Sequence, residues 1–306
     1  MNNKNKIIGN HWSKVSEKNV GVPRVLRWWQ SPYIIKYINK IVCGREVAGF
    51  SQGLIELVKN KTKDFIPFEK GISVGGGNGE KEMNLIEQGI VQTFELYEFS
   101  EVRIAQGKAL AKQRFLEGKI RFIHGDAFDL ITKTEQYDFV HWNNSLHHMF
   151  DVDKAVEWSR KILKSGGLFY MDDFIGSSRF QWPDAQLEIV TRIRKVFEKS
   201  KYLVNPDDRN SFLSTTMVRP DEQKFIKIDP SEAADSEKIV EAIYKYFPNA
   251  EVKYTGGVVY HQVLNDMLNN FDEKNDKILL DLLMIIDELC AKLGQTHYGV
   301  ALALKE

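Results

Sequence analysis

The sequence predicts an α/β fold with a doubly wound, seven-stranded sheet that is mostly parallel, with the last strand antiparallel. Between residues 67 and 174, short apolar segments alternate with amphipathic helical ones. A glycine-rich bend, "GGGNG", follows the first apolar segment, and a further strand-like segment, "HYGVALALKE", ends the chain. Strands that alternate with helices in this way form βαβ units, whose parallel sheet is covered by helices on both faces. The expected architecture is therefore Rossmann-like.

The elements follow in regular order. Five strands are predicted from "GISV", "VQTFELYEF", "KIRFIHGDAF", "YDFVHWNNS" and "GGLFYMDDF". The helices between them are predicted from "EKEMNLIEQG", from the segment that Ser100 opens, and from about residues 153–163. The sixth strand is expected at "AEVKYTG" and the seventh in "HYGVALALKE", with helices "VVYHQVLNDMLNNF" and "KNDKILLDLLMIIDELCAKL" between them. The apolar spacing supports each assignment.

Four parts of the chain are expected. Residues 1–66 form an N-terminal helical cap, in which "SPYIIKYINKIV" has the apolar spacing of a helix that Ser31 caps. Residues 67–174 form a ligand-binding core, and residues 250–306 complete its sheet. Residues 175–249 interrupt the alternation with the polar loop "LVNPDDRNSFLSTTMVRPDEQ", so we expect an insertion there that lies as a lid over one end of the sheet.

Composition excludes several classes of protein. The 42 Lys and Arg residues balance 42 Asp and Glu residues, which argues against a general affinity for nucleic acid or anionic membranes. Cys43 and Cys290 stand in no metal-like spacing, and "MNNKNKIIGNHW" lacks the apolar run of a signal peptide, so a cytoplasmic protein with reduced thiols is expected. The apolar segment 278–290 is too short to span a bilayer and could be buried internally or at a homodimer contact.

The glycine-rich bend indicates a ligand site. Gly75, Gly77 and Gly79 give the pattern G-x-G-x-G between a strand and a helix, where bare backbone lets a ligand approach the free N–H groups of the helix. Dinucleotide dehydrogenases prefer G-x-G-x-x-G, which seats a pyrophosphate. Here Glu80 occupies the third glycine position, and its carboxylate would oppose a pyrophosphate but tolerate a ligand with an ammonium group. A tight turn without a ligand is the alternative.

Two acids end the next two strands. Glu98 lies 19 residues after Gly79 and could accept hydrogen bonds from ribose hydroxyls, and Asp126 could accept one from an adenine amino group. The alternatives are a solvated acid at Glu98 and a turn-forming Gly-Asp pair at Asp126. Because ligands bind at the carboxyl ends of strands in open α/β sheets, the coincidence of all three features favours one shared site.

The sequence resembles the class I S-adenosylmethionine-dependent methyltransferases, through "ISVGGGNG", "YEFS", "HGDAF", "YDFVHWNNSLHH" and "LKSGGLFYMDD". The resemblance covers about residues 50–175 and resumes from 250. It implies S-adenosylmethionine as the cofactor, with the glycines at its methionine part, Glu98 at the ribose and Asn143 under the amino acid end. The implied cofactor residues are Gly75, Gly76, Gly77, Gly79, Glu98, Phe99, Asp126, Ala127 and Asn143. Ser73 stands where the family often has an acid, so Glu80 or a backbone carbonyl could contact the cofactor's ammonium group instead.

Candidate catalytic residues follow strands four and five. His147 and His148 could act as general bases, since imidazole titrates near neutral pH, or could only pack against the cofactor. Asp173 could bind or deprotonate a substrate hydroxyl, or be a solvated strand end. Because side chains alternate along a strand, Asp172 and Asp173 should point to opposite faces, so a metal site formed by this pair is disfavoured and none is expected.

Aromatic segments suggest where an acceptor binds. Trp28, Trp29, Arg179 and Trp182 should reach the same edge of the sheet, where they suit a sugar ring or another flat, polar molecule. Their alternative role is core packing, above all for the two neighbouring tryptophans. The leading hypothesis is methyl transfer to a hydroxyl of a small molecule or glycan. An NAD(P)-dependent oxidoreductase and a non-catalytic cofactor-binding scaffold are the alternatives.

Overall fold

The computed structural model describes residues 3–18 and 25–306, so residues 1–2 and 19–24 of the expected N-terminal cap lie outside it. Its main sheet has seven strands in the order β3-β2-β1-β4-β5-β9-β8. Strands β1 to β5 are parallel, and β9 runs antiparallel to both β5 and β8, so the predicted fold class is confirmed. The strands are β1 (Phe68–Val74), β2 (Val91–Glu98), β3 (Ile120–His124), β4 (Tyr137–Asn143), β5 (Leu163–Phe174), β8 (Glu251–Gly256) and β9 (Tyr298–Leu304).

Helices cover both faces of this sheet because alternate strand residues point to opposite sides. Val140 and Phe169 pack with residues of α7 (Val152–Ile162) and α10 (Ile239–Tyr246). Phe139 and Leu168 belong to the opposite core, with residues of α3, α4 and α5. These three helices are α3 (Gln52–Lys61), α4 (Glu80–Glu87) and α5 (Glu101–Gln113). Since α10 packs against α7, the helical layer already begins within the segment expected as the insertion.

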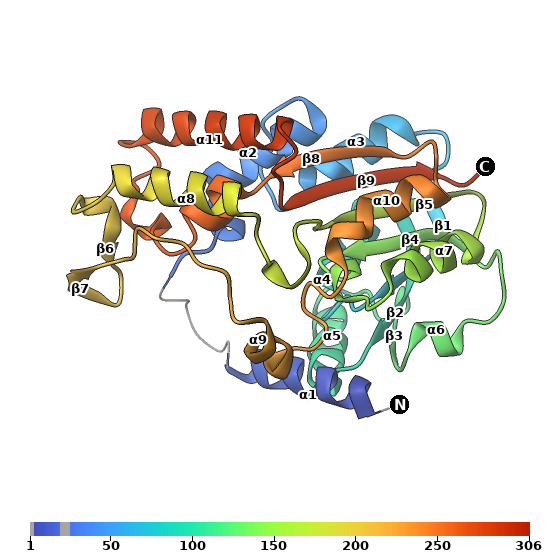
Figure 1. Cartoon of the computed structure of the whole chain (residues 1–306). Helices are drawn as coiled ribbons and strands as arrows, with labels where there is room; N and C mark the ends of the chain where they lie inside the picture. The colour runs from blue at the N-terminus through green and yellow to red at the C-terminus, as the bar shows by residue number, and fades with distance from the viewer. Residues whose placement is uncertain (1–2, 19–24) are drawn as a thin grey trace.

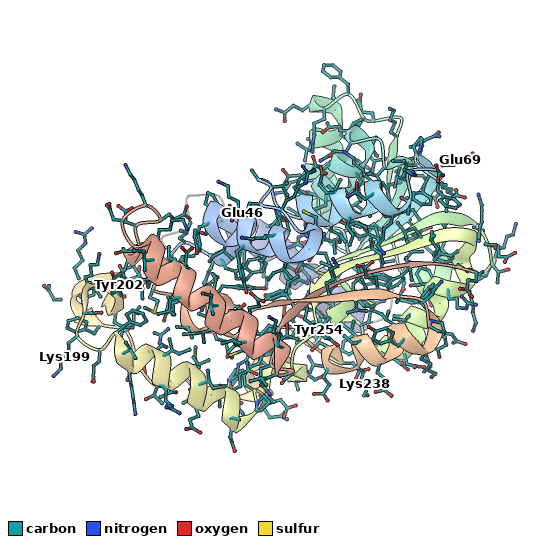
Figure 2. The ribbon with its side chains drawn as sticks, turned by 90° about the horizontal axis from the view of Figure 1, so that it is seen from above. Glu46, Glu69, Lys199, Tyr202, Lys238 and Tyr254 are labelled. Atoms are coloured by element: carbon teal, nitrogen blue, oxygen red, sulfur yellow. The ribbon has the colours of Figure 1, made fainter. Side chains whose placement is uncertain are left out.

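A third core lies beside the sheet rather than under it. Trp28, Val190, Tyr260 and Leu283 are buried together there. Trp28 comes from the N-terminal part of the chain, Val190 from the insertion, and Tyr260 and Leu283 from the C-terminal part. The elements around them are η1 (Trp28–Gln30), α2 (Pro32–Cys43), α8 (Asp184–Val196), the π-helical turn η6 (Val258–Val263) and α11 (Lys277–Lys292). Seen from above, α8 and α11 run away from the sheet, with Lys199 and Tyr202 at the end far from Glu69 (Figure 2).

The N-terminal helices do not form one cap. Helix α1 (Asn3–Lys18) lies beside α5 and near α9 (Glu222–Ile228), whereas α2 and α3 lie at the opposite side of the molecule (Figure 1). The predicted polar loop of the insertion contains a short hairpin, β6 (Val204–Asn205) and β7 (Asp208–Phe212). The predicted helix after β8 is only the π-helical turn η6, followed by the short 3-10 turn η7 (Leu268–Asn270). Gly256 and Gly257, which precede η6, both have positive φ.

Helix α11 keeps an apolar stripe in solvent. The side chains of Ile278, Leu282, Ile285 and Leu289 are each more than half exposed. A second copy of the chain could cover this stripe, and the homodimer stays a prediction. In the described part of the chain, no helix combines the length and apolarity that a bilayer crossing needs.

Candidate functional site

The glycine-rich bend joins the end of β1 to the start of α4. Gly75, Gly77 and Gly79 all have positive φ, between 64° and 74°, which other residues rarely adopt. At Gly79 a Cβ atom would lie 2.9 Å from both Ile120 and Phe122, so this glycine also permits close packing on β3. Gly76 leaves room for Ser73 and Glu82, whose Oγ and Oε1 atoms a Cβ would approach to 2.8 Å.

An acid lies at the base of this bend, although position 73 itself is a serine. The Ser73 hydroxyl donates to Oε1 of Glu82 over 2.7 Å, and His141 Nδ1 lies 2.7 Å from the same oxygen. All three side chains are buried. Glu82, in the first turn of α4, therefore supplies a carboxylate under the bend, while Glu80 is exposed at the helix start. From the sequence, Glu80 or a backbone carbonyl is predicted to contact the cofactor's ammonium group, and Glu82 is not identified.

Glu98 ends β2 beside the bend, because β1 and β2 are paired in parallel with Val74 opposite Tyr97. Its carboxylate is 5% exposed and accepts hydrogen bonds from Gly77 N–H over 3.0 Å and Ser100 N–H over 2.8 Å. Burial raises the pKa of Glu98, although these hydrogen bonds and the charge of Arg103 oppose the shift. The solvated alternative for Glu98 is therefore wrong.

Asp126 follows β3 and caps α6 (Ala127–Leu130). One carboxylate oxygen accepts from Phe128 N–H over 3.0 Å, as in an ordinary helix cap. The other accepts from the Asn5 side-chain amide over 3.0 Å. Asp126 thus holds α1 in place, a connection that sequence reasoning missed.

A cavity of about 380 Å³ lies at the carboxyl ends of β1 to β4. The predicted cofactor residues that line it are Gly75, Glu98, Phe99, Asp126 and Ala127. The other predicted glycines shape the bend behind it. Asn143 does not line the cavity, but its neighbour Asn144 does, with a positive φ of 49°. Asn143 instead accepts a hydrogen bond from the ammonium group of Lys81.

Helix α1 forms the outer wall of this cavity through Asn5, Ile8 and Trp12. The Trp12 ring lies 4.2 Å from the Arg103 guanidinium, and Ser13 hydrogen-bonds Ser100 over 2.9 Å. The sequence offered only a weak signal for this wall, namely the four-residue spacing of Ile8 and Trp12.

Asp173 and His147 are in direct contact at the end of β5. The carboxylate of Asp173 is fully buried and accepts from the backbone N–H groups of Ser145 and Leu146 over 2.9 and 2.7 Å. Its other oxygen hydrogen-bonds His147 Nδ1. Asp172 points the other way and accepts from Ser51 over 2.6 Å, as the strand alternation predicted. The solvated alternative for Asp173 is wrong.

Glu232, from the loop after α9, joins the two histidines. His147 Nε2 lies 3.4 Å from Oε1 of Glu232, and His148 Nε2 lies 3.9 Å from Oε2. His148 also lines the cavity, and its Nδ1 lies 3.1 Å from the Ser231 hydroxyl. Glu232 could not be found from the sequence, because no local pattern connects residue 232 with residue 147.

The charges of this cluster are strongly coupled. Burial alone would lower the pKa of His147, but the carboxylates of Asp173 and Glu232 outweigh it and raise the pKa to about 10. Burial, followed by the charge of His147, lowers the pKa of His148 to about 4. Burial acts to raise the pKa of Glu232, but the two histidines lower it to about 2.

The aromatic residues separate into two groups. Trp28 and Trp29 line a second pocket of about 620 Å³, together with Phe50, Lys81 and Asn144. Asn144 lines both pockets, so the two spaces lie on either side of this residue. Trp28 is also part of the third core, so both of its predicted roles have a structural counterpart.

Arg179 and Trp182 line neither of these two pockets. Trp182 is buried and stacks on His297 with ring centroids 4.4 Å apart. Arg179 donates from its guanidinium to the backbone carbonyl of Glu232 over 2.9 Å. These contacts correspond to the core alternative for Trp182 and to a loop-supporting position for Arg179.

The fold and the arrangement of the glycine bend with two strand-end acids define a class I, S-adenosylmethionine-dependent methyltransferase. The family model described as "Methyltransferase domain" matches residues 69–234, more than half of the chain, and the chain belongs to this family. The family and the G-x-G-x-G spacing both argue against the nicotinamide-dependent alternative.

One curated relative is the 27-O-demethylrifamycin SV methyltransferase of Amycolatopsis mediterranei (strain S699). It is 23% identical over 150 residues, which are 49% of this chain and 54% of that protein. The chain therefore matches about half of the length of this relative.

Two solved structures show the same fold. Phosphoethanolamine N-methyltransferase 2 of Haemonchus contortus has a TM-score of 0.51 and 13% identity, with 92% of this chain and 60% of that chain covered. Geranyl diphosphate C-methyltransferase from Streptomyces coelicolor A3(2) has a TM-score of 0.50 and 12% identity, with 100% and 98% covered.

Proposed function

We propose that the protein transfers a methyl group from S-adenosylmethionine to a hydroxyl oxygen of a small-molecule or glycan acceptor. The observation that carries the proposal is the cavity at the strand ends, into which Gly75, Glu98 and Asp126 are gathered from three successive strands. In the proposed complex Glu98 accepts from the ribose hydroxyls, and Asp126 and Ala127 border the adenine. The methionine part then extends past Gly75 toward Asn144.

Lys81 adds a contact for the amino acid end of the cofactor. Its ammonium group hydrogen-bonds Asn143, and the side chain lines the second pocket beside Asn144. Burial lowers the pKa of Lys81, while the charge of Asp172 raises it. A carboxylate ligand would stabilise the charged form of this partly desolvated ammonium group. We therefore assign the methionine carboxylate to Lys81.

The size and chemistry of the pockets support a small acceptor. Volumes of about 380 and 620 Å³ fall in the range of small-molecule sites. Trp29 and Phe50 offer apolar walls in the second pocket, which suit a sugar ring or another flat molecule. The curated relative is named for methylation of an O-demethylated rifamycin, which also favours oxygen and a small molecule.

His147, His148 and Asp173 are proposed to activate the acceptor hydroxyl. Methyl transfer is an in-line displacement, in which the acceptor oxygen must lie close to the methyl carbon and opposite the sulfur. The O–CH₃ bond forms as the S–CH₃ bond breaks, the bonding electrons stay on sulfur, and the hydroxyl proton leaves to a base. His148 is the member of this cluster that lines the cavity.

Calorimetric titration of the protein with S-adenosylmethionine, S-adenosylhomocysteine and NAD tests the cofactor. We expect S-adenosylmethionine and S-adenosylhomocysteine to bind and NAD not to bind. Binding of NAD alone would overturn the proposal. A panel of hydroxylated small molecules and glycans, assayed for transfer of an isotope-labelled methyl group, tests the acceptor class. Cofactor binding without transfer to any acceptor would favour the non-catalytic scaffold.

A further inference from the structure

We propose that His147, His148 and Glu232 bind a divalent transition-metal ion of the zinc type. Each residue offers one ligand atom, and these atoms lie within 4.8 Å of one another. Two of the separations are 3.4 Å, from His147 Nε2 to Glu232, and 3.9 Å, from His148 Nε2 to Glu232. Ligands on a tetrahedral zinc ion, each about 2.0–2.1 Å from the metal, stand about 3.3 Å apart. Small side-chain movements would therefore bring all three onto one ion.

The other nitrogen of each histidine is already held. His147 Nδ1 hydrogen-bonds the buried Asp173 carboxylate, and His148 Nδ1 lies 3.1 Å from the Ser231 hydroxyl. Metal-binding histidines almost always use their second nitrogen in this way, which fixes the ring and leaves the first nitrogen for the metal. Both Nε2 atoms are consequently directed at the same carboxylate.

The loop that carries Glu232 is held against the histidines. Ala234 N–H donates to the His147 carbonyl over 3.0 Å, and Arg179 N–H donates to the Ala233 carbonyl over 2.7 Å. Ala233 itself has a positive φ of 46°, a conformation that residues other than glycine rarely adopt. Strained backbone of this kind persists only where its surroundings enforce it, and it concentrates at functional sites.

A protonated His147 between two carboxylates is the simpler explanation for part of this geometry. It accounts for the contacts of His147 with Asp173 and Glu232, but not for the direction of His148 Nε2 toward the same acid. A proton on His147 Nε2 and a metal ion are alternative occupants of one position. The two imidazoles and one carboxylate suit zinc, cobalt or iron rather than magnesium, which prefers oxygen ligands.

The site borders the cofactor cavity, because His148 and Ser231 both line it. Three protein ligands leave at least one coordination position free, as in catalytic zinc sites. An acceptor oxygen bound there would be held and polarised beside the cofactor, so in the metal-bound protein the ion, rather than a free histidine, would activate the acceptor hydroxyl. This role rests on the proposed function, whereas metal binding itself does not.

Titration of chelator-treated protein with Co²⁺, followed by its visible d–d absorption, tests the site without cofactor or acceptor. We expect one ion per chain in the wild type, and no measurable site in Glu232→Gln or His148→Ala. Asp173→Asn, which keeps the size of the side chain but removes the charge that orients His147, should weaken binding ~10–100-fold. His124→Ala is the matched control, because His124 also lies 3.3 Å from an acid, Glu101, but has no second histidine. It should bind Co²⁺ as the wild type does.

Two results would overturn the metal site. One is wild-type protein that binds no Co²⁺, and the other is Glu232→Gln with unchanged Co²⁺ affinity. Circular dichroism and S-adenosylhomocysteine binding of each variant, measured without metal, verify that the fold is retained. A wild type that binds Co²⁺ but no S-adenosylmethionine would refute the proposed function and leave the metal site intact. The converse result would refute the metal site alone.

Discussion

The backbone N–H of Gly77 donates a hydrogen bond to the carboxylate of Glu98 over 3.0 Å. This contact joins the glycine bend after β1 to the tip of β2, two features that are 21 residues apart in the chain. The bend and the acid therefore belong to one site. A ribose bound there would meet a carboxylate whose position is already fixed by the backbone, so little ordering is required on binding.

Glu98→Ala should weaken the binding of S-adenosylhomocysteine by ~1–3 kcal/mol, since it removes hydrogen bonds to a charged group. Calorimetry of the variant gives this difference directly. Glu101→Ala is the control, because Glu101 is an exposed acid only three residues further along. An unchanged dissociation constant in Glu98→Ala would remove Glu98 from the ribose role.

Gly77→Trp should abolish cofactor binding while the fold is largely retained. A Cβ atom at Gly77 would lie 3.6 Å from Arg103 Nη1, an ordinary contact, although its positive φ costs ~1–2 kcal/mol for any other residue. Gly79→Ala is the contrasting variant, because its Cβ would collide with Ile120 and Phe122 and lower the melting temperature. Thermal unfolding and cofactor titration of both variants separate the two effects. Wild-type affinity in Gly77→Trp would place the ligand elsewhere.

Those parts of the site that lie directly at the ends of strands could be predicted from the sequence. The glycine spacing, Glu98 and Asp126 could be found because each directly follows an apolar strand. The opposite directions of Asp172 and Asp173 followed from strand alternation. These inferences needed only the order of the elements and the period of a strand.

Tertiary packing determines the residues that the prediction missed. Trp12, Lys81 and Glu232 reach the site through the docking of α1, the rotation of α4 and the path of a long loop. No local pattern contains that information. Arg179 and Trp182 show the same limit, because both are predicted from the sequence to line an acceptor site. In the structure the Arg179 guanidinium donates to the Glu232 carbonyl, and the Trp182 ring stacks on His297.

Lys81→Met should weaken S-adenosylhomocysteine binding by ~1–3 kcal/mol, the range for a lost hydrogen bond to a charged group. It should leave the affinity for 5′-methylthioadenosine unchanged, because that nucleoside lacks the amino acid end. Titration of both ligands into the variant tests the assignment, with the exposed Lys108→Met as control. Equal losses for the two ligands would show that Lys81 acts on the pocket as a whole and not on the carboxylate.

Stability should fall with rising pH because of Asp287. Burial raises the pKa of this side chain to about 7, although its carboxylate accepts from the N–H groups of Gly257 and Val259 and from the Tyr37 hydroxyl. In the unfolded chain an aspartate has a pKa of about 3.9. The stabilisation is therefore complete below about pH 4, and it is lost as the pH rises through the folded pKa near 7. The slope reaches about 1.4 kcal/mol per pH unit between the two values.

Urea unfolding of the wild type and Asp287→Asn between pH 5 and 8 measures this contribution. The wild-type free energy of unfolding should fall more steeply with pH than that of the variant. Asp281→Asn is the control on the same helix, because hydrogen bonds from Lys277 and Tyr33 lower the pKa of Asp281 and it stays charged in this range. Parallel pH profiles for wild type and Asp287→Asn would show that Asp287 is ionised in the folded protein.

His147→Ala and His148→Ala, assayed separately once an acceptor is known, should each lower turnover ~10²–10⁴-fold, the range for removal of an acid–base group. Cofactor affinity should be retained, because the hydrogen bonds assigned to the cofactor come from Glu98, Asp126 and Lys81 and not from the histidines. A purely packing role would produce the opposite pattern, with weaker cofactor binding and nearly unchanged turnover at saturation. His124→Ala, at the end of β3, is the control that should match the wild type in turnover. If His148→Ala alone retained full turnover, activation of the acceptor would have to proceed through His147 and Asp173 without the residue that lines the cavity.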